Sequence, residues 1–499
     1  MIRILIPICI FILLSCKPDL NNPNDPAKSD FWIRNFIQSL LLNDGCRNFS
    51  AWERRYGSGL YATYGTDFLF LPDGDIIVIG ATEDPILSGV TEGITGNFQG
   101  TPGESLNLFL LRLSRNNGDI VWVDYLGQMY SNLNFNPRLS RFANGDLAIS
   151  FISTVSGQNV PGLLSPRESN PNSIYVGRHR TDGSRTWYTY LDSVDVGNFL
   201  VTAVDGFDQI HLFLVNEGSN GHTAFSELPT PQNSPQGSES DTDILYAILE
   251  GNGQGKLQKY IASDYYDFPN NATYLNGSIY LGGVSAGSMN GYIHPTIGQT
   301  LPYIIKVNPE GNIEYLVYNG NPSATYGDSR QLVVTETSIL QLITTNSSWS
   351  SVVKETMQND TEHYAFAQYD LNGNLQWVSF LGSSTGDVEM FEEPPTIFES
   401  KSGLWRNRSR IPNLFDRYSS GSSVSTGDGS GAYQIADVYI QPNTGFFESI
   451  RYTSNFSSPE SKRTDQMKEL CAGKVGYMDR VFTSTETTPT KLGFQTSIE

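Results

Sequence analysis

Short apolar stretches recur along this chain in pairs, and each pair is joined by a turn that contains glycine. The clearest series of pairs spans residues 106–127, 173–192, 243–263, 302–320, 363–382 and 436–454. Alternating apolar and polar positions are typical of β-strands, and short Asn-Gly or Asp-Gly turns join antiparallel strands. The series therefore predicts six β-hairpins.

A second, weaker series of paired stretches precedes the first. Its members span residues 66–83, 137–154, 201–217, 271–285, 329–345 and 396–409. Their turns include Pro72–Asp75 and Ala143–Asp146, which have the residue types of tight hairpin turns. Each member followed by a hairpin of the first series makes a unit of four antiparallel strands. Such units bury both faces only when they stack radially, so the predicted fold class is an all-β propeller.

The spacing of tryptophan and glycine indicates the number of blades. Trp122–Gly127 and Trp377–Gly382 each end a hairpin, and the same spacing occurs at Trp52–Gly57, where no hairpin precedes it. This isolated segment predicts an outer strand whose sheet is completed by the C-terminal segments 476–484 and 491–495. We therefore expect seven blades in a domain over 46–499, and a six-bladed ring with a C-terminal appendage is the alternative.

The first 16 residues have the pattern of a bacterial secretion signal. One basic residue precedes an apolar run that is too short to span a membrane. The ending Leu13–Cys16 resembles the lipobox of bacterial lipoproteins. Residues 17–28, rich in Pro and Asn, are the predicted tether, and the segment 16–26 resembles the mature start of leptospiral lipoproteins. The resemblance implies lipidation at Cys16 and an outer-membrane anchor, with the protein periplasmic or on the surface. The alternative is a plain signal peptide with an incidental cysteine.

Residues 29–45 predict the one clear helix. Ser29 is a suitable N-cap, apolar residues follow at helical spacing over 29–44, and Asp44-Gly45 ends the pattern. We expect this amphipathic helix to pack on the propeller.

The chain contains four cysteines. Cys9 belongs to the signal segment and Cys16 is the predicted lipidation site, which leaves Cys46 and Cys471. Closure of the ring brings the chain ends together, so these two predict a disulfide. Two free buried thiols are the alternative.

Charge and histidine placement limit the expected partners. With 52 acidic and 32 basic residues the net charge is −20, which repels the phosphates of nucleic acids. The five histidines lack the spacing of metal ligands. We therefore expect a monomer with no nucleic-acid partner, no metal and no cofactor.

Three short motifs superficially match functional sites. Gly283–Gly287 has the G-x-S-x-G form around Ser285, but no helix follows it as a nucleophile elbow requires. Thr181–Trp187 partly resembles the sialidase Asp box, and Asp370–Asn374 has some features of a calcium loop. All three fit hairpin turns or strand ends, so the sequence predicts no catalytic residue.

The hairpin signature, in the form Tyr-Asp-Leu-Asn-Gly-Asn-Leu-Gln-Trp at residues 369–377, is similar to two repeat families. These are the SBBP-type β-propeller repeat of secreted bacterial proteins and the PQQ-like repeat. The resemblance implies a propeller. Quinoproteins of the second family commonly have adjacent cysteines near their cofactor, and this chain has no Cys-Cys pair.

Long connections link the two hairpins within each unit. They cover about 84–105, 155–172, 217–242, 286–301, 346–361 and 409–434, and the topology places them opposite the tight turns. Aromatic and arginine residues in them are the candidate ligand anchors: Phe98, Tyr292, Arg410 and Phe415. The predicted function is a membrane-anchored scaffold that binds protein or glycan through this face. Alternatives are a structural scaffold for envelope assembly and a glycan hydrolase or lyase.

Overall fold

A computed structural model provides the three-dimensional structure of the chain. It describes residues 49–87, 93–129, 137–153, 161–166, 173–192, 196–217, 224–237, 241–320, 327–349, 352–355, 363–381, 396–399, 403–412, 423–424, 433–452, 461–471, 474–482 and 491–498. The predicted signal peptide, tether and helix, together with Cys16 and Cys46, lie outside the described residues. Among the described residues, no helix combines the length and apolar character needed to cross a membrane.

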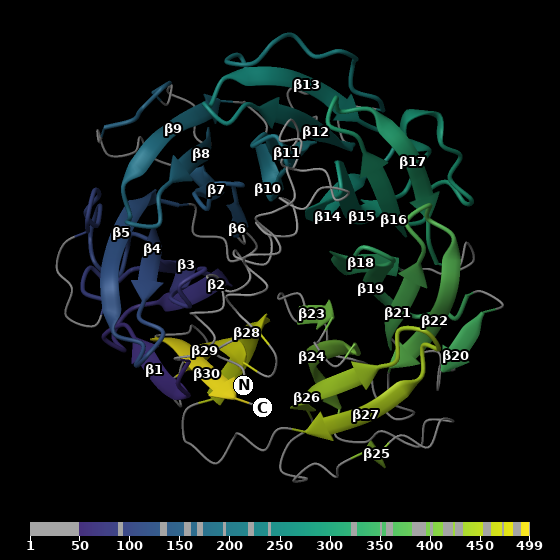
Figure 1. The fold of residues 1–499 in the computed structure, drawn as a ribbon. Coiled ribbons are helices and arrows are strands. Elements are labelled where there is room, and N and C mark those ends of the chain that lie inside the picture. The colour runs from purple at the N-terminus through teal and green to yellow at the C-terminus, as the bar shows by residue number, and fades with distance from the viewer. Residues whose placement is uncertain are drawn as a thin grey trace, which may run out of the picture.

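The described strands form seven antiparallel sheets of four principal strands that stand side by side around a central axis (Figure 1). The predicted seven-bladed β-propeller is therefore confirmed, and the six-bladed alternative is wrong. We number the blades along the chain and call their strands a to d, from the innermost to the outermost. Both predicted series of hairpins are present, as the a–b and c–d pairs.

The strands of the first four blades follow one another without interruption. They are β2 (Thr63–Phe70), β3 (Ile76–Thr82), β4 (Asn107–Leu113) and β5 (Ile120–Gln128); β6 (Arg138–Arg141), β7 (Leu147–Ser153), β8 (Ser173–His179) and β9 (Arg185–Asp192); β10 (Val196–Val204), β11 (Ile210–Glu217), β12 (Thr242–Leu249) and β13 (Gly255–Ile261); and β14 (Asp267–Leu275), β15 (Ser278–Ser285), β16 (Leu301–Val307) and β17 (Ile313–Tyr318). A single 3-10 turn, η2 (Met289–Gly291), lies between β15 and β16.

Blades 5 and 6 contain a fifth strand each, and blade 7 combines both ends of the chain. The strands are β18 (Gly327–Val334), β19 (Ile339–Thr345), β20 (Val353–Glu355), β21 (His363–Tyr369) and β22 (Leu375–Leu381); β23 (Thr396–Glu399), β24 (Trp405–Pro412), β25 (Ser423–Val424), β26 (Tyr433–Ile440) and β27 (Phe447–Tyr452); and β28 (Ser461–Cys471), β29 (Lys474–Phe482), β30 (Lys491–Ile498) and β1 (Trp52–Tyr56).

The ring closes as the Trp52 segment predicted. Strand β1 is the outer strand of blade 7 and pairs antiparallel with β30, with Trp52 opposite Thr496. The ring of Phe494 on β30 meets Phe68 of blade 1 edge-to-face at 4.9 Å and lies 5.7 Å from the ring of Trp52. Strand β28, the inner strand of this blade, has no recognisable hairpin pattern, and the sequence did not predict it. Cys471 ends this strand, while its expected partner Cys46 is outside the described residues, so the disulfide stays a prediction.

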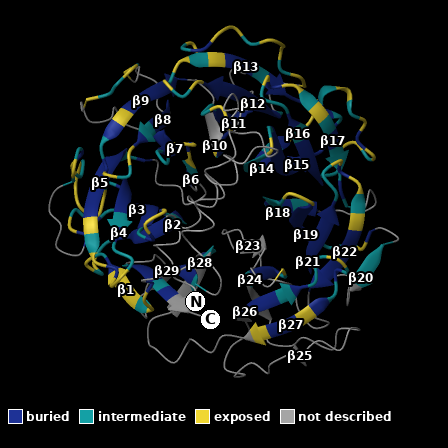
Figure 2. Ribbon diagram, viewed as in Figure 1, coloured by how far each residue is buried: buried dark blue, intermediate teal, exposed yellow. Residues whose placement is uncertain are grey.

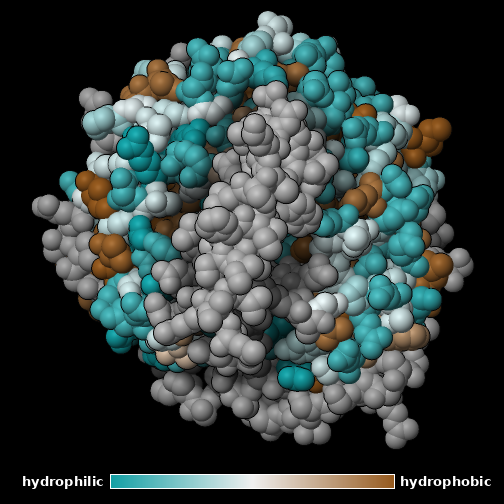
Figure 3. Space-filling model, viewed as in Figure 1, coloured by the Kyte–Doolittle hydropathy of each residue, from teal (hydrophilic) through white to brown (hydrophobic). Residues whose placement is uncertain are grey.

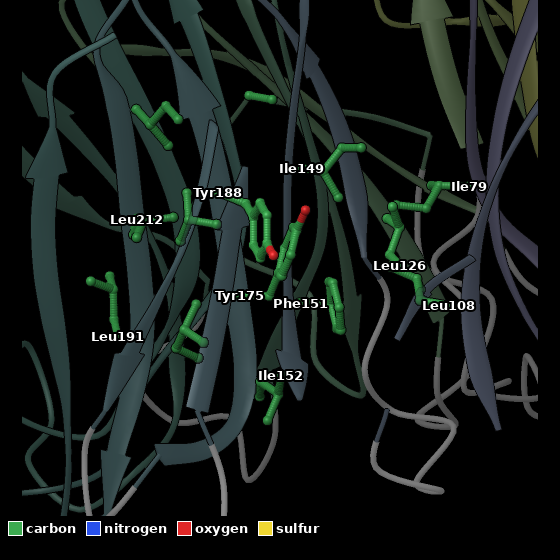
Figure 4. Packing of buried hydrophobic residues seen from close by; sticks show 14 of the residues in the cluster. Ile79, Leu108, Leu126, Ile149, Phe151, Ile152, Tyr175, Tyr188, Leu191 and Leu212 are labelled. Carbon is green, nitrogen blue, oxygen red and sulfur yellow. The ribbon is translucent and has the colours of Figure 1, made fainter. Parts of the chain in front are cut away.

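The core lies between neighbouring blades. The middle strands are buried on both faces, since every residue of β3 and of β15 is buried (Figure 2). Figure 4 shows how side chains interleave, with Tyr175 and Tyr188 stacked at a centroid distance of 5.5 Å. Strands sandwiched on both sides require apolar residues at consecutive positions, which explains the continuous apolar runs of the sequence.

A large side chain of each of five outer strands packs on a turn glycine of the next blade. The pairs are Trp52 with Gly118, Trp122 with Gly183, Trp187 with Gly253, Tyr315 with Gly373, and Trp377 with Gly445. These glycines have φ between +73° and +89°, and a Cβ atom on any of them would lie 2.5–3.2 Å from the ring. We call this contact the ring–glycine lock. The c–d turns therefore need glycine for two reasons: the positive φ of the turn and the close approach of the ring, which leaves no room for a Cβ atom.

Because the four strands of each blade are antiparallel, the two kinds of connection lie at opposite ends of the propeller axis. The a–b and c–d turns lie at one axial end, the turn face. The b–c connections and the links between blades start at the other end, which we call the loop face. The turn face carries little besides short hairpin turns.

In blades 1, 2, 3, 5 and 6, described segments of the b–c connections return along the outer strand of their own blade. In blades 5 and 6 they add β20 parallel to β22 and β25 parallel to β27, outside the ring of d strands (Figure 1). Blades 1 to 3 have equivalent bonds: Ile94 N–H to Val123 O, Tyr125 N–H to Gly96 O, Leu164 N–H to Tyr188 O, Tyr188 N–H to Gly162 O, and Gln232 N–H to Gln258 O. The prediction that these connections gather at the loop face is wrong for these segments of blades 1, 2, 3, 5 and 6, because an outer strand has unpaired backbone groups that the connections satisfy.

Candidate functional site

Two of the four predicted loop anchors, Phe98 and Tyr292, pack against the body of the propeller. Phe98 is half-buried, and its ring meets Tyr125 of β5 edge-to-face at 5.8 Å. Tyr292 is half-buried against the core of blades 3 and 4. Arg410 lies within strand β24 rather than in a loop, and Phe415 is outside the described residues. Phe98 and Tyr292 are therefore poor candidates for direct ligand contact.

Three aromatic rings meet at the loop face, where the inner strands of blades 3 and 4 begin. Phe199 of β10 and Phe268 of β14 lie 5.5 Å apart, and Tyr266, just before β14, lies 6.4 Å from Phe268. Phe199 is 38% exposed and Tyr266 is 47% exposed, while Phe268 is half-buried. Neighbouring exposed rings present apolar surface to the solvent. A ligand that covers these rings removes this surface from water, which favours binding. We call these three residues the aromatic cluster.

The link between blades 3 and 4 holds Tyr266 outward. The Ser263 N–H and hydroxyl both donate to the Asp267 carboxyl group, at 2.6 and 3.1 Å. The Tyr265 N–H donates to the Ser263 hydroxyl oxygen at 3.1 Å. Side-chain bonds of this kind close a tight turn, so residues 264–266 at its tip remain exposed.

Two buried carboxyl groups lie beside this link, one at the start of β12 and one at the start of β14. Burial raises the pKa of Asp243 to about 7, and the charges of Asp241 and Asp264 add to this effect. The Gln236 N–H donates to Asp243 at 2.9 Å and lowers the pKa by a smaller amount. Burial also raises the pKa of Asp267 well above its usual range.

The raised pKa of Asp243 predicts a pH-dependent stability. The folded protein binds this proton more tightly than the unfolded chain, in which the pKa is near 4. The stabilisation of the folded state by this proton is complete below pH 4 and is lost as the pH rises through 7. Asp243→Asn should therefore raise the free energy of unfolding at pH 8 by about 2–4 kcal/mol and change it little at pH 4.

Denaturant titrations at pH 4 and pH 8 measure this difference. Glu310→Gln is the matched control, because Glu310 is an exposed carboxylate on the turn face. It should change the stability by less than about 0.5 kcal/mol at both pH values. Equal effects of Asp243→Asn at both pH values would contradict the assignment.

Ser285, the centre of the G-x-S-x-G motif, is fully buried at the end of β15. Its hydroxyl donates to the Gly287 carbonyl at 3.0 Å and accepts the Gly287 N–H at 3.1 Å. The chain then enters η2, so the strand-to-helix turn of a nucleophile elbow is absent here. His294 is buried nearby, and its Nδ1 accepts the Thr296 N–H at 3.1 Å. These contacts shape the connection and leave Ser285 without access to solvent.

The other two motifs form c–d turns. Asp182 accepts bonds from the Ser184 hydroxyl and N–H at 2.6 and 2.9 Å, which lowers its pKa. Asp370 accepts the N–H groups of Asn372 and Asn374, both at 2.9 Å. In the described part of the chain, no three His, Cys, Asp or Glu side chains are grouped to bind a metal ion.

A cavity of about 670 Å³ lies between blades 2 and 3. Residues of β9 and the c–d turn of blade 3 line it, with two carboxylates, Glu227 and Glu250. Burial raises the pKa of Glu227, which accepts the Asp192 N–H at 3.3 Å. Because β9 is an outer strand (Figure 1), this cavity opens at the rim and is separate from the aromatic cluster.

Sequence reasoning missed Phe199 and Tyr266. The link reads Ser-Asp-Tyr-Tyr-Asp at residues 263–267, and two adjacent aromatic residues between acidic ones are a usable signal of an exposed site. Phe199 offers no such signal, because its position beside Phe268 depends on two strands that are about 70 residues apart in sequence.

No protein-family model matches the chain, and no curated protein matches its sequence. Among solved structures, the polysaccharide lyase Uly1 is 8% identical with a TM-score of 0.45, covering 87% of this chain and 90% of its own. The α-L-arabinofuranosidase Arb93A from Fusarium graminearum is 10% identical with a TM-score of 0.39, covering 90% and 98%.

A quinohemoprotein alcohol dehydrogenase from Pseudomonas putida HK5 is also similar. It is 8% identical with a TM-score of 0.38, covering 90% of this chain and 76% of its own. At these identities the activities of the similar proteins do not carry over to this chain.

Proposed function

We propose that this propeller binds a carbohydrate chain at its loop face, with the aromatic cluster as the binding platform. The observation that carries the proposal is the contact of three rings, two of them more than a third exposed, on inner strands of adjacent blades. The C–H groups of a sugar ring pack favourably on the negative face of an aromatic ring. A platform of this size matches one or two sugar units.

Polar groups beside the rings can bind sugar hydroxyls. Asp264 is exposed in the same link as Tyr266. Asn270, two residues beyond Phe268, is half-buried, and its side-chain NH2 group donates to Asp328 at 3.0 Å and to the Ser329 carbonyl, so its amide oxygen is the group that can accept from a sugar hydroxyl. Amide and carboxylate groups at the edge of an aromatic platform supply orientation, since stacking by itself is weakly directional.

Binding to oligosaccharides tests the proposal. A glycan array of neutral, acidic and amino-sugar oligosaccharides selects a ligand, and calorimetry then measures its affinity. Phe199→Ala and Tyr266→Ala should each weaken binding by at least about tenfold. Phe207→Ala is the matched control, because Phe207 is 67% exposed in an a–b turn on the turn face. Unchanged affinity in both cluster variants, or binding to none of the glycans, would contradict the proposal.

A second candidate function is glycan cleavage. A carboxyl group with a raised pKa is what a general acid requires, and Asp243 and Asp267 both have this property. It ranks second because both side chains are 0% exposed. Chromatography of the bound oligosaccharide after incubation distinguishes the two functions, and Asp243→Asn should abolish any cleavage.

We also propose that the protein is a lipoprotein of the bacterial cell envelope, anchored in the outer membrane through Cys16. The support is the signal-like segment 1–16 with its lipobox-like ending, and the resemblance of residues 16–26 to the mature start of leptospiral lipoproteins. A tethered propeller would present its glycan platform, as a monomer, to the periplasm or to the cell exterior. Two or more acyl chains are enough for stable anchoring.

Substitution of the proposed lipidation site tests the anchor. Cys16→Ala should move the protein from the detergent phase to the aqueous phase in detergent partitioning of whole cells. Cys9→Ala, which changes another cysteine of the same segment, should leave the partitioning unchanged. An unaltered distribution of the Cys16 variant would refute the anchor.

A further inference from the structure

In the described part of the chain, the outer strand of blade 4 has no covering segment like those of its neighbours. In blades 1, 2, 3, 5 and 6, a segment of the b–c connection forms backbone bonds or a parallel strand along strand d. Within the described residues, no such segment pairs with β17 (Ile313–Tyr318), the d strand of blade 4. This is the case although residues 286–300, its b–c connection, are described throughout.

The connection of blade 4 is diverted to the preceding blade. The Asn290 N–H donates to the Ala262 carbonyl at the end of blade 3, at 3.1 Å. The Asn290 side chain accepts the Ala262 N–H in return, at 3.2 Å. From β17, the side chain of Tyr318 bonds to this connection: its hydroxyl accepts the Met289 N–H and donates to the Gly287 carbonyl. None of the described segments therefore pairs with the outer backbone edge of β17.

The register shows which backbone groups are open. Leu316 stands opposite Ile305, as Tyr188 stands opposite Gly177 in blade 2. The N–H and carbonyl of Tyr188 point outward and bond to Gly162 and Leu164. By the same geometry the N–H and carbonyl of Leu316 and the N–H of Tyr318 point away from β16.

Exposure along the outer strands agrees with an open edge. Among the six residues of β17 only Leu316 is buried, whereas β9 and β22 are buried over most of their length (Figure 2). Leu316 itself is 7% exposed, while the residues at the equivalent position in blades 2 and 5, Tyr188 and Val378, are 0% exposed. An open edge of this kind invites pairing with a further strand.

We propose that β17 is a docking edge for an extended segment of a partner protein, which adds to blade 4 as a fifth strand parallel to β17. The other blades supply the template, since β20 and β25 run parallel to their d strands. Main-chain bonds to Leu316 and Tyr318 would provide the affinity, as in other cases of strand addition. This site lies on the outer rim and is independent of the proposed glycan platform.

The covering segments of the other blades define the chemistry of the partner segment. The best paired of them, Gly162–Ser165 on β9, consists of small and aliphatic uncharged residues. The covering strand β20 reads Val-Lys-Glu, but the middle of the β17 edge, Tyr315–Val317, has no charge to pair with such residues. We therefore take Gly162–Ser165 as the template: an extended, uncharged segment of three to four residues made of glycine, serine and aliphatic residues.

Hydrogen exchange resolved to single amides tests the docking edge. In the protein alone, the amides of Leu316 and Tyr318 should exchange at least about tenfold faster than those of Tyr188 and Tyr190. The probe is a synthetic peptide, Val-Pro-Gly-Leu-Leu-Ser-Pro, with the sequence of residues 160–166. At millimolar concentration it should slow the exchange of Leu316 and Tyr318.

A methylated peptide is the matched control. Methylation of the backbone nitrogen at the second leucine removes the donor equivalent to the Leu164 N–H, which bonds to Tyr188 O in blade 2. This peptide should give no protection. Slow exchange of Leu316 and Tyr318 in the dilute protein alone, or no protection by the unmodified peptide, would overturn the proposal. Protection that rises with protein concentration would assign the edge to a second copy of this chain and would also overturn it.

Discussion

Gly445→Ala is expected to lower the free energy of unfolding by about 2–5 kcal/mol. Gly445 has φ +74°, which costs an alanine about 1–2 kcal/mol. The added Cβ would also lie 2.6 Å from the ring of Trp377, a buried side chain that cannot move without opening the space between blades 5 and 6. Overpacking of this kind costs a further 1–3 kcal/mol or so.

Gly403→Ala in the same blade separates the two contributions. Gly403 has φ +77°, and its added Cβ would meet no atom within 4 Å. It should therefore show the backbone cost of about 1–2 kcal/mol by itself. Denaturant unfolding of both variants gives the difference. Equal losses in the two variants would show that the ring–glycine lock contributes nothing beyond the turn conformation.

Phe494→Ala should destabilise the protein by about 3–5 kcal/mol, because it opens a cavity where the ring of blades closes. Phe494 is 0% exposed and lies between Phe68 of blade 1 and Trp52 of the N-terminal strand. Deleting the ring of Phe494 removes the contacts of the C-terminal strand β30 with Phe68 and with Trp52. The predicted disulfide between Cys46 and Cys471 would reinforce the same closure.

Thermal and denaturant unfolding measure the effect of Phe494→Ala against Phe207→Ala. Phe207 is exposed on the turn face, so its truncation should cost less than about 0.5 kcal/mol. A loss below about 1 kcal/mol for Phe494→Ala would mean that the contact between blades 7 and 1 contributes little to stability.

The two surfaces proposed for binding differ in their chemistry. The aromatic cluster offers rings and polar groups at the loop face, whereas β17 offers backbone groups at the rim. Figure 3 shows one face of the molecule, on which the apolar side chains of the described residues are scattered around the rim among polar ones. Recognition through a few rings and one strand edge therefore fits this surface better than a broad apolar interface.

The sequence by itself determined the strands, the hairpins and the closure of the ring. Alternating apolar positions around Asn-Gly and Asp-Gly turns specify antiparallel strands locally, because strand periodicity and turn conformation depend on neighbouring residues. The isolated Trp52 segment was enough to predict an outer strand from the N-terminus, and hence seven blades. Strand β28 escaped prediction, since it has no turn signal of its own.

Only the tertiary structure decided where the connections go and which residues come together. Described b–c connections cover the outer strands of blades 1, 2, 3, 5 and 6. Phe98 and Tyr292 pack against the core, where the sequence suggested ligand anchors. Phe199 meets Phe268 across two blades, and no described segment pairs with the outer edge of β17, since Asn290 of the blade 4 connection bonds to blade 3. Such contacts join residues far apart in the chain, and no local pattern specifies them, because they depend on how the blades stack.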